Sequence, residues 1–78
     1  MTREEAYAKL NEVFRDVFDD DALTVQDTTT AADVPGWDSL VHIRLIAAVE
    51  DEFDMRFDMK DVVGMKNVGE MADILQKN

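Results

Sequence analysis

Three side chains that could do chemistry are predicted to share one helical turn: Asp38, Ser39 and His42. Ser39 and His42 are three residues apart, so they are neighbours on a helix surface and could pair as nucleophile and base. A hydrolase also needs a third group that orients the base, and donors that meet the developing oxyanion in a dry pocket. One turn in a chain of 78 residues does not supply these groups. We therefore expect no Ser-His enzyme, and interpret His42 as a partly buried imidazole whose nitrogens find local partners.

Ser39 has a second possible chemistry, which depends on its place in the chain. It follows a long loop that ends in Pro35-Gly36-Trp37, and it stands at the predicted start of a helix that either Asp38 or Ser39 can cap. The backbone N–H groups and the dipole at a helix N-terminus favour an attached phosphate. A phosphodiester on Ser39 would therefore lie where the field of the helix stabilises it.

The first element that must position this turn is a helix near the N-terminus. Thr2 followed by Glu5 is the pattern of a capping box. The pattern of apolar residues predicts one buried stripe that ends before the three acids at 19–21. The stripe consists of Ala6, Tyr7, Leu10, Val13, Phe14, Val17 and Phe18.

A loop at 22–37 connects this helix to the next, and it has no sustained period. Spaced apolar residues predict that it is pinned to the core: Leu23, Val25, Ala31 and Val34. The second helix runs to about Phe53, and its core side is predicted to hold His42, Ile46, Val49 and Phe53, flanked by Ile43 and Leu45. Its weakly apolar front, available to a partner, would hold Val41, Arg44, Ala48 and Asp51.

The remaining sequence predicts a short turn of helix and a last helix. Asp58 is expected to cap the turn from Met59 to Val63, which Gly64 ends. Asn67, with Glu70 three residues on, is expected to cap the last helix. Its inward residues would be Val68, Met71, Ala72, Ile74 and Leu75. The predicted fold is all-α: one domain over residues 1–78, a small four-helix bundle of three main helices and one short helix, with a long loop between the first two.

Composition limits the function further. There are 18 acidic and 8 basic residues, a formal net charge of −10 and no cysteine. This charge repels phosphate backbones and anionic lipids, so we expect no nucleic-acid partner and no membrane partner. The acids around 19–21 do not form an EF-hand, because Leu23 and Thr24 stand where an acid and a glycine are needed, and no metal site is predicted. With no long apolar run and no signal peptide, we expect a cytoplasmic monomer.

The whole pattern resembles the acyl carrier proteins. The resemblance rests on the Asp-Ser-Leu triplet at 38–40, on Gly36, and on the Glu-Asp-Glu-Phe sequence at 50–53 that closes the same helix. It also includes the long loop, the short third helix and a last helix led by Val68, and so it covers nearly the whole chain.

This resemblance implies a carrier protein and not an enzyme. A phosphopantetheinyl transferase would attach a 4′-phosphopantetheine arm, taken from coenzyme A, to Ser39. The thiol of the arm would hold an acyl group as a thioester and present it to acyl-transferring, ligase or synthase enzymes with basic patches. The absence of cysteine fits this interpretation, because the only thiol would then be that of the arm.

The resemblance also implies roles for individual residues. Asp38 would help to engage the transferase, and Leu40 would insert into partner surfaces. Glu50 and Asp51 would pair with basic patches on partner enzymes. Met59 and Val63, with Val62, would belong to a mobile short helix that gates a pocket for the acyl chain. The residues expected to line that pocket are His42, Ile43, Ile46, Phe53, Val62 and Ile74.

Two positions depart from the family pattern. Positions 41 and 44 are usually acidic in fatty-acid carriers, but here they are Val41 and Arg44. Because charge complementarity governs encounter rate and partner choice, these residues and Ala48 are predicted to direct partner recognition. We therefore expect a stand-alone carrier of a specialised pathway that makes a secondary metabolite, a polyketide-like product or a modified lipid.

Two alternatives stay open at this point. One is a carrier of aminoacyl groups, of the peptidyl or D-alanyl type; Asp38 argues against the peptidyl type, and less firmly against the alanyl type. The other is an acidic helical interaction module that carries no prosthetic group and depends on its charged face alone.

Overall fold

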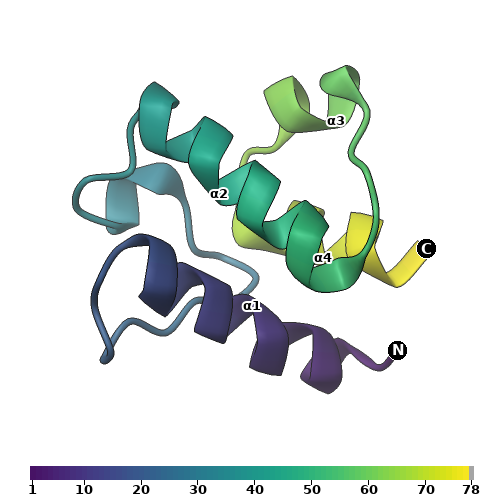
Figure 1. The fold of residues 1–78 in the computed structure, drawn as a ribbon, viewed down its shortest axis with the longest axis horizontal. Helices are drawn as coiled ribbons and strands as arrows, with labels where there is room; N and C mark the ends of the chain where they lie inside the picture. Colours follow the sequence, from purple (N-terminus) through teal and green to yellow (C-terminus); the bar gives the residue numbers. More distant parts are fainter. Residues whose placement is uncertain (78) are drawn as a thin grey trace.

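The computed structural model describes residues 1–77, which fold into four α-helices with no strand among them. The helices are α1 (Arg3–Val17), α2 (Ser39–Phe53), α3 (Met59–Gly64) and α4 (Val68–Lys77), and one 3-10 turn, η1 (Ala31–Asp33), lies in the first loop. Helix α1 runs beneath α2, α3 lies at the opposite edge of the molecule, and both chain ends lie on one side (Figure 1). The predicted all-α fold with one short helix is confirmed.

Helix α1 begins where the sequence predicts. The Thr2 hydroxyl accepts a hydrogen bond from the Glu5 N–H at 3.1 Å, and the Glu5 carboxylate accepts one from the Thr2 N–H at 3.1 Å. This reciprocal pair is the capping box, which satisfies backbone donors that an isolated helix start leaves unpaired. The helix then packs closely against both α2 and α4.

The core is built from one face each of α1, α2 and α4, together with Val25 of the loop. Removal of these side chains from water is the main force that holds so small a bundle together. Its buried members are Leu10, Val13, Phe14, Val25, Leu45, Ile46, Val49, Val68, Met71, Ala72 and Leu75. Ile74, predicted to face inward with them, is only half-buried.

The first loop is held against the bundle by three of the four apolar residues predicted to do so. Val25 and Val34 are buried and Leu23 is half-buried. The Val25 N–H also donates to Asn11 Oδ1 of α1 at 2.7 Å. The expectation for Ala31 is wrong: it is exposed, because it opens the η1 turn on the surface.

Helix α3 begins and ends where the sequence predicts, but neither end has the predicted cap. Asp58 stands at the N-cap, but its side chain makes no capping hydrogen bond. Gly64 is the last helical residue without a left-handed backbone, and Met65 continues in an extended conformation. Glycine therefore does not terminate this helix by the usual left-handed cap. No residue of α3 is fully buried.

Helix α4 follows its prediction closely at its start. The Glu70 N–H donates to Asn67 Oδ1 at 2.9 Å, and Glu70 Oε2 accepts from the Lys66 N–H at 2.7 Å. Among residues 1–77, no helix is both long enough and apolar enough to cross a lipid bilayer.

Candidate functional site

Asp38 and Ser39 occupy different positions at the start of α2. Asp38 is the N-cap, with an extended backbone, and its Oδ1 accepts from the Val41 N–H at 2.9 Å. Ser39 is therefore the first residue of the helix, and it is exposed. The turn before it requires Gly36, whose φ of +86° is costly for a residue with a Cβ.

Trp37 joins this turn to the core. Its indole packs edge-on against Phe14 at a centroid distance of 5.4 Å and tilts against Phe18 at 6.0 Å. Phe14 lies in the last turn of α1, and Phe18 is the C-cap of that helix. Since aromatic pairs of this geometry add stability beyond their burial, the backbone that leads into Ser39 is held against α1.

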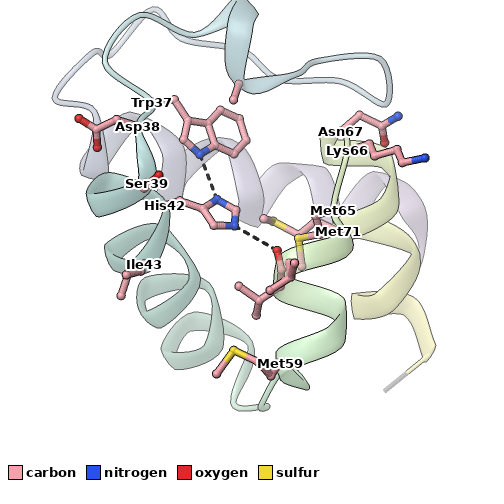
Figure 2. A pocket seen from close by; sticks show the side chains of 13 residues that line it. Trp37, Asp38, Ser39, His42, Ile43, Met59, Met65, Lys66, Asn67 and Met71 are labelled. Atoms are coloured by element: carbon pink, nitrogen blue, oxygen red, sulfur yellow. Dashed lines mark hydrogen bonds between the residues drawn. The ribbon is translucent and has the colours of Figure 1, made fainter.

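Both ring nitrogens of His42 are engaged. The Trp37 indole N–H donates to Nδ1 at 3.1 Å, and Nε2 lies 3.4 Å from the carbonyl oxygen of Val62 in α3 (Figure 2). The interpretation of His42 as a half-buried imidazole with local partners is confirmed. Neither nitrogen bonds to Ser39, so the arrangement gives no general base for that hydroxyl.

A pocket of about 600 Å³ opens beside Ser39, between α2 and α3 (Figure 2). It contains three of the residues expected to line an acyl pocket: His42, Ile43 and Val62. The full set is mainly apolar, with Asp38, Lys66 and Asn67 among its members. The other lining residues are Ala31, Trp37, Ser39, Met59, Val63, Met65 and Met71.

The remaining expected lining residues lie elsewhere. Ile46, Phe53 and Ile74 do not line this pocket. Ile46 is 7% exposed and belongs to the main core, while Phe53 ends α2 with the Lys9 ammonium 5.5 Å from the centre of its ring. Ile43 does line it but is 66% exposed, so it forms the rim and not the interior.

The front of α2 is rotated relative to its prediction. Val41 and Ala48 are half-buried, and Ala48 lies where α1 packs against α2, in a groove that Val13 and Val17 also line. Besides Ser39, the residues that α2 exposes are Leu40, Ile43, Arg44, Ala47, Asp51 and Glu52. Met59 and Val63 of α3 are also exposed, and with Leu40 and Ile43 they are the large exposed apolar side chains of α2 and α3, which we call the apolar rim.

Glu50, expected to be a surface charge for partners, has a structural contact. It is half-buried, and its Oε2 accepts from the Phe57 N–H at 2.8 Å. The carboxylate thus ties the connection between α2 and α3 back to α2. The sequence shows no sign of this contact, because the partner is a backbone group seven residues away.

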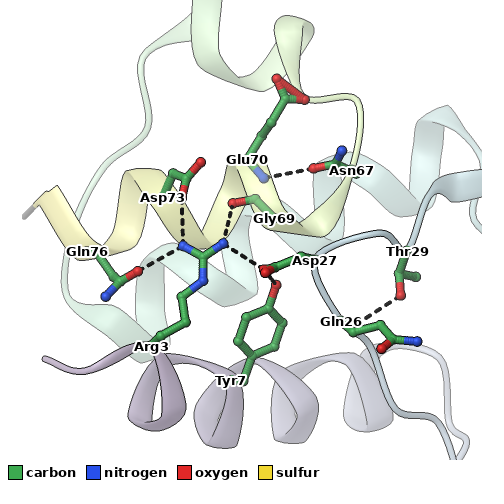
Figure 3. Close-up of polar contacts among 10 residues, drawn as sticks. All are labelled: Arg3, Tyr7, Gln26, Asp27, Thr29, Asn67, Gly69, Glu70, Asp73 and Gln76. Carbon is green, nitrogen blue, oxygen red and sulfur yellow. Dashed lines mark hydrogen bonds and ion pairs between the residues drawn. The ribbon is translucent and has the colours of Figure 1, made fainter.

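A polar cluster that sequence reasoning missed holds the first loop to both ends of the chain (Figure 3). Arg3 bonds to Asp27 and to Asp73, each at 2.6 Å, and to Gln76 Oε1 at 2.8 Å. The Tyr7 hydroxyl also donates to Asp27. We call these five residues the Arg3 cluster. No signal in the sequence pairs residues so far apart in the chain.

The loop also approaches the start of α4 closely. The Gly69 N–H donates to the Asp27 carbonyl at 3.1 Å, and a Cβ at position 69 would lie only 2.8 Å from that oxygen. Contacts within the Arg3 cluster shift the pKa values of Tyr7 and Asp27. Burial and the bond to Asp27 raise the pKa of Tyr7, while the Tyr7 hydroxyl and Arg3 lower the pKa of Asp27. This side of the molecule is therefore fixed by polar contacts as well as by the core.

No group of three or more His, Cys, Asp or Glu side chains within residues 1–77 is placed to hold a metal ion. The acids around the groove between α1 and α2 are Glu12, Asp16, Asp51 and Glu52.

Comparisons with known proteins agree with this geometry. Residues 8–75 match the family model described as a phosphopantetheine attachment site. The solution NMR structure of a holo acyl carrier protein from Geobacter metallireducens is similar, with a TM-score of 0.86 and 38% sequence identity over 92% of this chain and 83% of that one. No curated protein matches the sequence. The match spans most of the four-helix fold, and it implies a covalently attached 4′-phosphopantetheine and a carrier without catalysis of its own. The chain belongs to the family of phosphopantetheine-binding carrier proteins.

Proposed function

We propose that this protein carries acyl intermediates as thioesters on a 4′-phosphopantetheine arm attached to Ser39, and delivers them to the enzymes of a specialised biosynthetic pathway in the cytoplasm. The observation that carries the proposal is the position of Ser39. It is the only serine in the sequence, it is exposed at the first residue of α2, and it lies at the edge of a mainly apolar pocket.

The residues around Ser39 suit such an arm. The first turn of α2 directs the positive end of its dipole at the position that the phosphodiester would occupy. The aromatic contacts of Trp37 hold the preceding turn in place, so the attachment point is presented in a fixed orientation. When bound, the arm supplies the thiol that the chain lacks.

The surface around Ser39 suggests how partners are chosen. Leu40 is 71% exposed and Arg44 is exposed beside it, in a chain whose net charge is −10. A partner must therefore accept one cation and an apolar rim at this place, whereas acids such as Asp51 meet its basic patch farther along α2. This mixture supports a specialised set of acyl-transferring, ligase or synthase enzymes, because a misplaced charge lowers both encounter rate and affinity.

Loading in vitro tests the attachment point. The purified chain is incubated with coenzyme A, Mg²⁺ and a phosphopantetheinyl transferase of broad specificity, and its intact mass is measured. We expect a gain of one phosphopantetheinyl group, no gain in Ser39→Ala, and a full gain in Thr28→Ala, which removes another exposed hydroxyl. Full loading of Ser39→Ala, or no loading of the wild-type chain by any transferase, would overturn the proposal.

A further inference from the structure

His42 bridges three segments that meet beside Ser39. It belongs to the first turns of α2, its Nδ1 accepts from the indole of Trp37 in the preceding turn, and its Nε2 faces the Val62 carbonyl of α3. The imidazole also stacks on the Trp37 indole, with ring centroids 5.9 Å apart. We call the contacts from Trp37 through the imidazole to the Val62 carbonyl the His42 bridge (Figure 2).

The partners of the ring decide its protonation state. An indole N–H can only donate, so Nδ1 must be unprotonated. A carbonyl oxygen can only accept, so Nε2 must carry the proton. The bridge therefore needs a neutral imidazole in the single tautomer with hydrogen on Nε2. In a cationic ring or in the other tautomer, Nδ1 would carry a hydrogen that faces the indole N–H of Trp37, and neither group could accept a hydrogen bond.

The bridge matters because few other contacts fix α3, chiefly the half-buried Val62 side chain that packs against the core. This six-residue helix has no buried residue, its N-cap aspartate makes no side-chain bond, and Met59 and Val63 are 77% and 79% exposed. Among residues 1–77, the contact between His42 and Val62 is the one hydrogen bond that joins α3 to another helix. Val62 lies near the end of α3, where backbone carbonyls have no donor inside the helix.

We propose that His42 is a positioning residue: it holds α3 against α2 at the mouth of the pocket, and so limits how far an acyl group enters toward Met71. The second half of this statement rests on the proposed function, whereas the first concerns the chain alone. Met71 is 1% exposed and lines the same pocket, so it marks the inner end of the path from Ser39.

The unmodified protein tests the bridge itself. Nitrogen-15 spectra of the single histidine at mildly alkaline pH report its tautomer directly, and we expect the neutral form with hydrogen on Nε2. The form with hydrogen on Nδ1, or fast averaging between the two forms, would overturn the bridge. This measurement needs no variant, so it holds even if substitution at position 42 impairs folding.

Substitution then tests what the bridge holds. His42→Phe keeps an aromatic ring against Trp37 but removes both nitrogens, and Ile43→Ala is the matched control on the exposed rim. We expect amide hydrogen exchange in α3 to rise about three- to tenfold in His42→Phe, as the loss of one net hydrogen bond implies. Exchange at Leu10 and Phe14 of α1 should not change, and neither should α3 in Ile43→Ala. Unchanged exchange in α3, or an equal rise throughout the protein, would contradict a positioning role.

Acyl entry is tested on the loaded protein. Medium-length acyl groups are placed on the arm of the wild-type chain and of His42→Phe, and the methyl resonances of Met65 and Met71 are compared before and after acylation. We expect a larger acyl-dependent shift at Met71 in His42→Phe. Equal shifts in both proteins would overturn the limit on entry. Failure of both proteins to load would instead defeat the proposed function and leave the tautomer result intact.

Discussion

The two sides of this small bundle are held together in different ways. On one side α1, α4 and the first loop share the core, and the Arg3 cluster ties both chain ends to Asp27. On the other side α3 has no buried residue and bonds to α2 through His42. Because local opening follows the number of buried and hydrogen-bonded contacts, the second side should open at far lower cost. Under the proposed function, this division would keep the attachment point fixed and leave one wall of the pocket free to move.

The largest effect should come from removing the central side chain of the fixed side. Phe14 is fully buried and packs against Trp37. We expect Phe14→Ala to lower the free energy of unfolding by about 3–5 kcal/mol, through lost burial and the cavity left behind. Val63→Ala on the exposed face of α3 should change it by less than about 0.5 kcal/mol. Urea denaturation of both variants measures the difference, and comparable losses would break the contrast between the two sides.

A matched pair of glycines tests the close approach of the first loop to α4. Gly69→Ala would place a Cβ 2.8 Å from the Asp27 carbonyl, a backbone atom that cannot move freely, so we expect a loss of about 1–3 kcal/mol. Gly64→Ala has open space around its Cβ and is helical, so it should stabilise α3 by up to about 1 kcal/mol. Thermal denaturation compares them. Equal destabilisation by both substitutions would show that the close approach of the Asp27 carbonyl is not the cause of the stability lost in Gly69→Ala.

The connection that leads out of α2 should gain stability from a single change. Asp54 ends α2 with φ of 51°, a left-handed conformation that glycine adopts without strain, and its charge lies at the negative end of the helix dipole. We expect Asp54→Gly to raise the free energy of unfolding by about 1 kcal/mol. Asp51→Gly, inside the same helix, should lower it by a similar amount. A loss of stability in Asp54→Gly would mean that the aspartate side chain has a contact that outweighs its strain.

The smallest effect should appear at alkaline pH, on the fixed side. The pKa of Tyr7 is raised in the folded state. The stability that the protonated Tyr7 hydroxyl contributes is therefore fully present below the ordinary tyrosine pKa of about 10, and it is lost as the pH rises through the pKa of the folded protein. The melting temperature of the wild type should therefore fall more steeply above about pH 10 than that of Tyr7→Phe. Since Tyr7 is the only tyrosine, its absorbance gives the ionisation directly. Parallel pH profiles in the two proteins would exclude this contribution.

Whether an interaction could be predicted from the sequence depends on how far apart its residues lie along the chain. The capping box at Thr2 and the side-chain caps at Asp38 and Asn67 involve residues three apart, and the structure confirms all three. The Arg3 cluster joins residues up to 73 positions apart, and no periodic pattern signals it. The predicted burial of Ala31 and the predicted left-handed cap at Gly64 are wrong for a related reason. Burial and backbone conformation in short segments depend on what packs against them, and α3 and η1 have few such contacts.

The same rule separates the features of the candidate site that could be predicted from those that could not. The start of α2 at Ser39, with Asp38 as its cap, could be predicted because it follows from signals within a few residues. The pocket could be predicted only in part, since His42, Ile43 and Val62 line it but Ile46 and Phe53 do not. Which face of α2 meets α1 depends on how the two helices cross, and this also moved Val41 and Ala48 away from the exposed front.

The most direct test of the carrier function is the intact mass of the protein isolated from its native host, followed by peptide mapping. We expect the mass of the 78-residue chain plus one phosphopantetheinyl group, with an acyl group on part of the molecules that hydroxylamine removes. The whole modification should map to Ser39. A chain without the arm while its pathway is active, or an arm on any other residue, would contradict the proposed function.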